Sequence, residues 1–123
     1  MYVHFPFCLR KCGYCDFVSF KSERDDIPHE AYADAVLAEL GARLDAFVAS
    51  GAPSPTLSTV FFGGGTPSLW ETRSLARVLS GIRERFGRAP TEVTVECNPT
   101  SLDLDKAKAL RDAGVDRLSI GIQ

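Results

Sequence analysis

Residues 59–87, TVFFGGGTPSLWETRSLARVLSGIRERFG, contain the β/α pattern that decides the fold. The segment opens with a short apolar strand at residues 59–62, and glycines follow it directly. From Thr72 to Phe86 apolar residues recur at helical spacing, and Gly87 can then end a helix in the left-handed conformation. A strand, a glycine turn and an amphipathic helix in this order predict one β/α unit of a parallel sheet.

The same alternation continues on both sides of this unit. Further strands are predicted at residues 2–7, 92–97 and 117–122, and further helices at about residues 29–50 and 103–113. We therefore expect an α/β fold, the N-terminal half of a partial TIM-like (β/α) barrel with parallel strands and outer helices.

The chain is expected to be one domain, residues 1–123, without a linker. The last predicted strand has neither a helix to cover it nor a partner for its outer edge. This predicts a fragment that lacks the rest of the barrel and a C-terminal domain; a complete small α/β domain is the alternative.

The composition is that of an ordinary globular protein. Of 123 residues, 45% are hydrophobic and 24% are charged, and 14 basic against 16 acidic side chains give a formal net charge of -2. This balance gives no electrostatic footprint for nucleic acid. No apolar run approaches the roughly 18 residues of a membrane span, and no secretory leader follows Met1, so we expect no transmembrane segment and a cytoplasmic location.

Three closely spaced cysteines form the most specific pattern in the chain. Cys8, Cys12 and Cys15 have the spacing C-x3-C-x2-C in a segment, residues 8–15, that we call the cysteine loop. Thiolates favour zinc, copper(I) or iron-sulfur clusters, and three ligands leave one iron of a cubane cluster open. A structural zinc site completed by His4 or Cys97 is the alternative, although Cys97 also reads as a buried structural thiol.

Polar groups follow the other predicted strands at the same end. The glycine turn, Gly63–Thr66, follows the second strand, Glu96 ends the third and Gln123 ends the fourth. Functional groups of β/α barrels gather at the C-terminal ends of the strands, where the cysteine loop is also expected. The turn matches neither GxGxxG nor the phosphate-binding GxxxxGK[ST], and an ordinary capped strand-to-helix turn is its alternative reading.

The segment YVHFPFC at residues 2–8, together with CGYCDF at residues 12–17, resembles the radical S-adenosylmethionine (SAM) enzymes. Within them it is similar to the group of oxygen-independent coproporphyrinogen III oxidases and their relatives, over essentially the whole chain. The resemblance implies a radical SAM barrel with a [4Fe-4S] cluster on the three cysteines and SAM on the open iron. The cofactor-binding residues that it implies are Tyr2, Tyr14, Gly64, Gly65, Thr66, Glu96 and Gln123, and it assigns no further catalytic residue.

Two departures bear on the branch of this group. Phe17 stands where the oxidase branch usually carries a further cysteine, and Met1 stands where that branch has a longer extension. Both features resemble the heme chaperone branch instead, which implies heme as a further ligand and a heme-acceptor protein as a partner.

The alternative within the group is an oxygen-independent coproporphyrinogen III oxidase. Such an enzyme generates a 5′-deoxyadenosyl radical for the oxidative decarboxylation of porphyrinogen propionate side chains. Either reading implies SAM, an electron donor to the cluster, and a heme or porphyrinogen ligand. A radical SAM enzyme with another substrate is a third possibility, because fold and cluster do not define the substrate.

Overall fold

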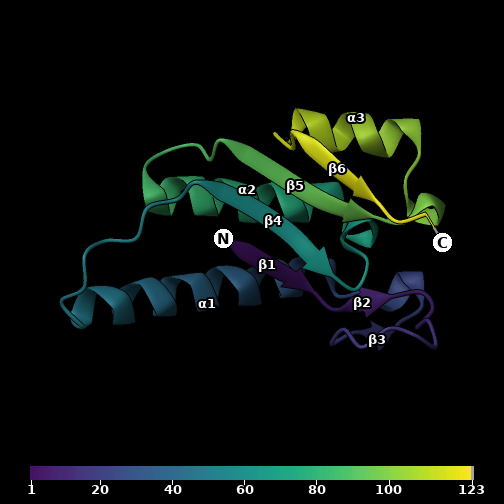
Figure 1. Cartoon of the computed structure of the whole chain (residues 1–123), viewed down its shortest axis with the longest axis horizontal. Helices are drawn as coiled ribbons and strands as arrows, with labels where there is room; N and C mark the ends of the chain where they lie inside the picture. The colour runs from purple at the N-terminus through teal and green to yellow at the C-terminus, as the bar shows by residue number, and fades with distance from the viewer. Residues whose placement is uncertain (123) are drawn as a thin grey trace.

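The computed structural model describes residues 1–122, which form a four-stranded parallel sheet with a helix between each pair of neighbouring strands (Figure 1). The strand order is β1-β4-β5-β6. The strands are β1 (Tyr2–Phe5), β2 (Phe7–Cys8), β3 (Phe20–Lys21), β4 (Thr59–Gly64), β5 (Glu92–Cys97) and β6 (Arg117–Ile120). The helices are α1 (His29–Ala49), α2 (Thr72–Phe86) and α3 (Leu104–Asp112), with short 3-10 turns η1 (Arg24–Asp26), η2 (Pro67–Leu69) and η3 (Pro99–Ser101).

The parallel ladder confirms the predicted α/β class. Helix α2 and strand β5 have the predicted bounds, because each carries a strong local pattern. Gly87 has a φ angle of 64°, the left-handed conformation that the sequence predicted at this helix end, and Gly114 after α3 has a φ angle of 95°.

The prediction of one first strand at residues 2–7 was wrong in one respect, because two separate strands, β1 and β2, form there. Strand β1 ends at Phe5, and β2 pairs with β3 in a separate two-stranded parallel sheet that the sequence did not predict. Pro6 has no N–H group with which to continue the first ladder. Its carbonyl instead accepts a hydrogen bond of 2.7 Å from the amide of Phe20. The chain therefore leaves the main sheet just before the cysteine loop.

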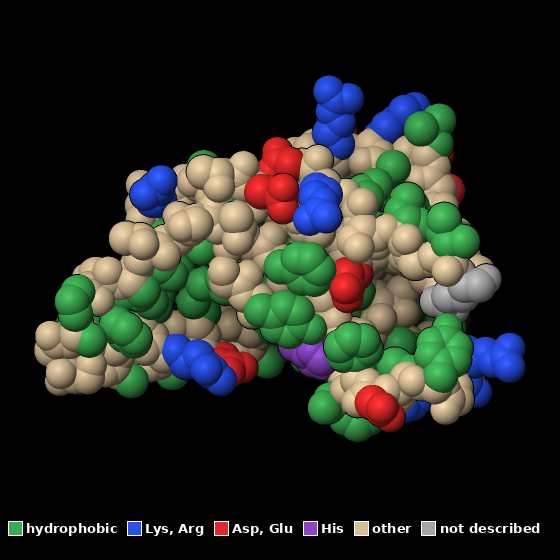
Figure 2. Space-filling model, in the orientation of Figure 1, with side chains coloured by type: hydrophobic (Ala, Val, Ile, Leu, Met, Phe, Trp, Pro, Cys, Tyr) green, Lys and Arg blue, Asp and Glu red, His purple; other side chains and the backbone are tan. Residues whose placement is uncertain are grey.

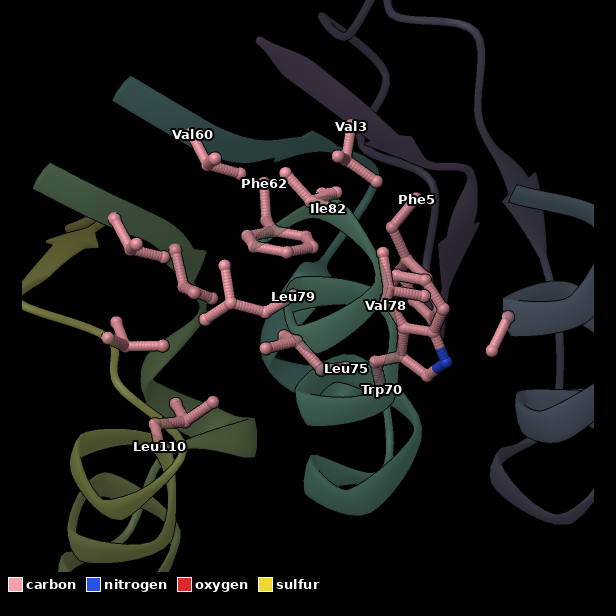
Figure 3. Packing of buried hydrophobic residues seen from close by; sticks show 14 of the residues in the cluster. Val3, Phe5, Val60, Phe62, Trp70, Leu75, Val78, Leu79, Ile82 and Leu110 are labelled. Atoms are coloured by element: carbon pink, nitrogen blue, oxygen red, sulfur yellow. The ribbon is translucent and has the colours of Figure 1, made fainter. Parts of the chain in front are cut away.

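The core lies between the main sheet and α2. Figure 3 shows the Phe62 ring of β4 directed toward Leu79 of α2. Trp70 is fully buried, its ring stacks on Phe5 at a centroid distance of 5.0 Å, and its Nε1 donates to the His29 carbonyl at 3.0 Å. These contacts fix β1, and with it the start of the cysteine loop, against the helical layer.

The two faces of the main sheet have different characters because side chains alternate along a strand. Val3 and Phe5 of β1 are buried in the core, whereas Tyr2 and His4 alternate with them and lie on the opposite face. In β5, Glu96 lies on that opposite face as well. The polar side chains of β1 and β5 therefore meet on the side of the sheet that the helices do not cover.

None of the helices in residues 1–122 is long and apolar enough to cross a membrane.

Candidate functional site

A cavity of about 300 Å³ lies at the C-terminal ends of the parallel strands, beside the cysteine loop. In Figure 2, hydrophobic side chains lie along the visible face, at this end of the molecule as well as at its centre and opposite end. Eight of the predicted cluster- and cofactor-binding residues line the cavity together: Cys8, Cys12, Cys15, Tyr14, Gly64, Gly65, Thr66 and Glu96. The predicted meeting of strand ends and cysteine loop is thus present in the fold. Asn98 and Ser119 also line the cavity, and the rule that placed Glu96 at a strand end could have found both.

The three thiols are held in different ways. Cys8 ends β2, and its carbonyl accepts a hydrogen bond of 2.8 Å from the amide of Ser22, so its backbone is part of a ladder. Cys12 and Cys15 lie on a turn closed by a bond of 3.1 Å from the Cys15 amide to the Cys12 carbonyl. All three are half-buried and lie outside any disulfide.

This donor set fits an iron-sulfur cluster better than a single zinc ion. Within residues 1–122 no group of three His, Cys, Asp or Glu side chains lies close enough to hold one ion. A cubane cluster makes no such demand, because each thiolate binds a different iron. The two residues proposed to complete a zinc site are engaged elsewhere: His4 Nε2 lies 2.7 Å from the Val18 carbonyl oxygen, and Cys97 Sγ donates to the Val95 carbonyl.

The glycine turn packs directly against β1 and the cysteine loop. A Cβ atom built on Gly64, whose φ is 116°, would lie 2.6 Å from the His4 ring. One built on Gly65 would lie 2.7 Å from the Phe7 carbonyl oxygen and 3.0 Å from Cys8 Sγ. The distances of 2.6 and 2.7 Å are shorter than those that real Cβ atoms show, and 3.0 Å is tighter than most of them. Glycine is therefore required here by packing, whether or not a ligand approaches.

Three amide hydrogens of this turn are already used. The Gly64, Gly65 and Thr66 amides donate to Glu96 Oε2 at 3.1 Å, to the Phe5 carbonyl at 2.7 Å and to the Phe7 carbonyl at 2.9 Å. Carbonyl oxygens are thus the backbone groups that the turn can offer to a ligand. Carbonyl oxygens attract ammonium groups and repel phosphate, so the turn suits an amino group rather than an anion.

Tyr2 does not line the cavity itself. Its neighbour Glu96, whose charge acts on it, does line the cavity. Burial first, and then the negative charge of Glu96, raises the pKa of the Tyr2 phenol above its ordinary value. The phenolic oxygen lies 3.1 Å from His4 Nδ1. Since Nε2 faces a carbonyl oxygen that can only accept, Nε2 carries a proton; in the tautomer protonated at Nε2 alone, Nδ1 accepts from the Tyr2 hydroxyl.

His4 is therefore a link that sequence reasoning missed. It joins Tyr2 on the sheet to Val18 in the segment that follows the cysteine loop. Lys11 makes a parallel connection, because its Nζ donates to the carbonyls of Phe17 and Ser19 at 3.3 Å each. The alternation of β1 could have placed His4 on the face of Tyr2, but its distant partner left no local signal.

Two aromatic side chains stand at the rim of the cavity. Tyr14 is 75% exposed and Phe17 is 63% exposed, although both line the cavity. Cys97 is buried as predicted, and this burial raises the pKa of its thiol to about 11. Gln123, a predicted cofactor-binding residue, lies outside the described residues.

A comparison with family models matches residues 2–123 to the Radical SAM superfamily, and the chain belongs to this family. Membership implies a [4Fe-4S] cluster and SAM, for which the cavity supplies three thiols and a carbonyl-rich turn.

The individual relatives narrow the group. The chain is 39% identical over 124 residues to the heme chaperone HemW of Escherichia coli strain K12, covering 100% of this chain and 31% of that protein. It is 37% identical to the anaerobilin synthase of Escherichia coli O157:H7, of which it covers 27%. The structure of coproporphyrinogen III oxidase (HemN) from Escherichia coli superposes with a TM-score of 0.81 at 30% identity, over 99% of this chain and 27% of that one.

These relatives confirm the resemblance to the coproporphyrinogen III oxidase-like group, and the superposition confirms the fold class. The chain spans about a third of the length of the curated relatives that it matches.

Proposed function

We propose that residues 1–123 are the cluster- and SAM-binding domain of a heme chaperone. In this proposal Cys8, Cys12 and Cys15 hold the [4Fe-4S] cluster and leave one iron open for SAM. The observation that carries it is the single cavity in which these thiols, the glycine turn and Glu96 meet.

Each part of the cavity has a task in this proposal. The carbonyls at Gly64 and Gly65 receive the amino group of SAM, because the turn has already used its amides. Glu96 holds the turn through the Gly64 amide and offers a carboxylate to the ribose or methionine groups of SAM. The remaining proposed cofactor contacts are Tyr2, Tyr14, Thr66 and Gln123.

The cluster, when bound and reduced, supplies an electron that can cleave the sulfonium of SAM. The chain itself holds the thiolates in place and keeps water from the cavity. His4 and Lys11 serve the first task, since they tie the carbonyls of residues 17–19 to the sheet and to the loop. Phe17 and Tyr14 serve the second task, because they stand at the cavity rim.

Phe17 is the residue that favours a heme chaperone over an oxidase. It occupies the position of the further cysteine of the oxidase branch, and it lines the cavity rim with an apolar ring. Relatives named heme chaperone HemW at 36% to 40% identity support the same branch. The proposal places the protein in the cytoplasm, with an electron donor for the cluster and a protein that accepts heme.

The cluster is tested by anaerobic reconstitution of the protein with iron and sulfide. We expect a [4Fe-4S] signal in Mössbauer and electron paramagnetic resonance spectra that shifts when SAM is added. Cys12→Ala should abolish the signal. Cys97→Ala is the matched control and should retain it, because Cys97 lies in the core and donates to the Val95 carbonyl. Stoichiometric zinc without a cluster would overturn the proposal.

The heme ligand needs a separate test. Titration of the reconstituted protein with heme should give saturable binding, and incubation with coproporphyrinogen III and SAM under reducing conditions should give no protoporphyrinogen. Formation of protoporphyrinogen would instead establish the oxidase alternative.

A further inference from the structure

Thr66 has a contact that its predicted role at SAM does not explain. Its hydroxyl oxygen Oγ1 lies 3.5 Å from Cys8 Sγ, within hydrogen-bond range for sulfur. A metal-bound thiolate has no proton to give, so the hydroxyl must be the donor once Cys8 is a ligand.

The surroundings of Thr66 hold this hydroxyl in place. The Thr66 amide donates to the Phe7 carbonyl at 2.9 Å, and its carbonyl accepts from the Leu69 amide at 2.9 Å as η2 begins. On the other side, Cys8 ends the β2 ladder. Donor and sulfur are therefore both anchored by backbone bonds, whereas Cys12 and Cys15 lie on a turn.

We propose that Thr66 is a positioning residue that tunes the cluster through a hydrogen bond to the Cys8 sulfur. The proposal rests on the cluster assigned under Proposed function. Hydrogen bonds to cluster sulfurs are one of the factors that set the reduction potential. Reduction adds negative charge to the cluster, so a hydroxyl donor stabilises the reduced form more than the oxidised form. Thr66 thus raises the potential and makes the cluster easier to reduce.

The test is the midpoint potential of the reconstituted cluster without SAM, followed by electron paramagnetic resonance during a redox titration. Thr66→Val keeps the shape and loses the hydroxyl, and its potential should fall by up to about 59 mV, the value of a tenfold change for one electron. Thr66→Ser restores the donor and should keep the wild-type potential. Thr91→Val, the same change beside β5 at the far end of the sheet, should also leave it unchanged.

The outcomes separate this inference from the proposed function. If the wild-type protein forms no cluster, the proposed function fails first. If Thr66→Val takes up the cluster and keeps the wild-type potential, the cluster assignment stands and the role of Thr66 is wrong. Thr66→Ala also removes the hydroxyl, but it does not put a methyl group in its place as Thr66→Val does. An unchanged midpoint potential in Thr66→Ala would overturn the inference equally.

Discussion

Gly65→Ala tests whether the glycine turn is required by packing rather than by backbone conformation. The φ angle of Gly65 is not among the positive ones, so alanine meets no backbone strain at this position. The built Cβ lies 2.7 Å from the Phe7 carbonyl oxygen, 0.7 Å inside the 3.4 Å at which ordinary contact begins. The neighbour is backbone, so relief requires β2 to move and to carry Cys8 with it.

The expected cost follows from what that movement breaks. A shift of β2 lengthens the bond of 2.9 Å from the Thr66 amide to the Phe7 carbonyl beyond hydrogen-bond range. Such a bond contributes about 1 kcal/mol, and forced overpacking costs a further 1 to 3 kcal/mol or so. We therefore expect Gly65→Ala to lower the free energy of unfolding by about 2 to 4 kcal/mol.

The measurement is equilibrium unfolding in urea, with iron content after reconstitution as a second readout. The matched control is Gly13→Ala, because a Cβ on Gly13 of the cysteine loop meets nothing within 4 Å. It should be neutral or slightly stabilising. Wild-type stability and full iron content in Gly65→Ala, or an equal loss in Gly13→Ala, would refute the packing argument.

Three other variants test the elements around the site. Trp70→Ala should cost about 3 to 5 kcal/mol in urea unfolding, because the buried indole stacks on Phe5. Burial raises the pKa of Cys97 from 9.0 to about 11, so the unfolded chain loses its thiol proton first and stability should fall between these pH values. Cys97→Ala should remove this loss of stability with rising pH, which is on the order of 2 kcal/mol in the free energy of unfolding. His4→Leu should cost about 1 kcal/mol and lower iron uptake, because it frees the Val18 carbonyl; unchanged iron content would count against this link.

The sequence predicted those parts of the fold that have strong local signals. Helix α2 and strand β5 were placed at their bounds, since one is amphipathic and the other is rich in β-branched residues. Helix α1 was predicted at about residues 29–50, close to its observed bounds. The structure leaves Phe47 and Val48 exposed, because the end of α1 runs past the sheet that would cover them (Figure 1).

Strands β2 and β3 show why other parts of the fold could not be predicted from the sequence. Each has two residues, too few for any periodicity, and each exists because of a partner more than ten positions away in the chain. The bond from the Phe20 amide to the Pro6 carbonyl belongs to the same class. Such non-local backbone pairing leaves no trace in a single sequence, although it shapes the base of the cysteine loop.

The candidate site divides in the same way. Spacing and strand-end position predicted which residues would meet, because both depend on chain order and on the common direction of the strands. They did not predict what each residue does there. Gly64 and Thr66 stay predicted SAM contacts, but nothing in the sequence indicated that their amides would be bonded to Glu96 and to the Phe7 carbonyl. Which groups of a turn remain for a ligand depends on register between strands, and register is set by the folded structure.

The arrangement of the two sheet faces explains how stability and chemistry can be separated in this protein. Val3 and Phe5 pack into the core, while His4 between them is hydrogen-bonded to the Val18 carbonyl, just after the cysteine loop. Neighbouring positions of β1 therefore have different roles. Changes on the core face should act mainly on the free energy of unfolding, and changes on the other face mainly on cofactor binding, with a smaller cost in stability as expected for His4→Leu. Gly65 is an exception, because its missing side chain makes room for both a backbone carbonyl and the Cys8 sulfur. A substitution there should therefore move both quantities together, which is why the two readouts are measured on the same variant.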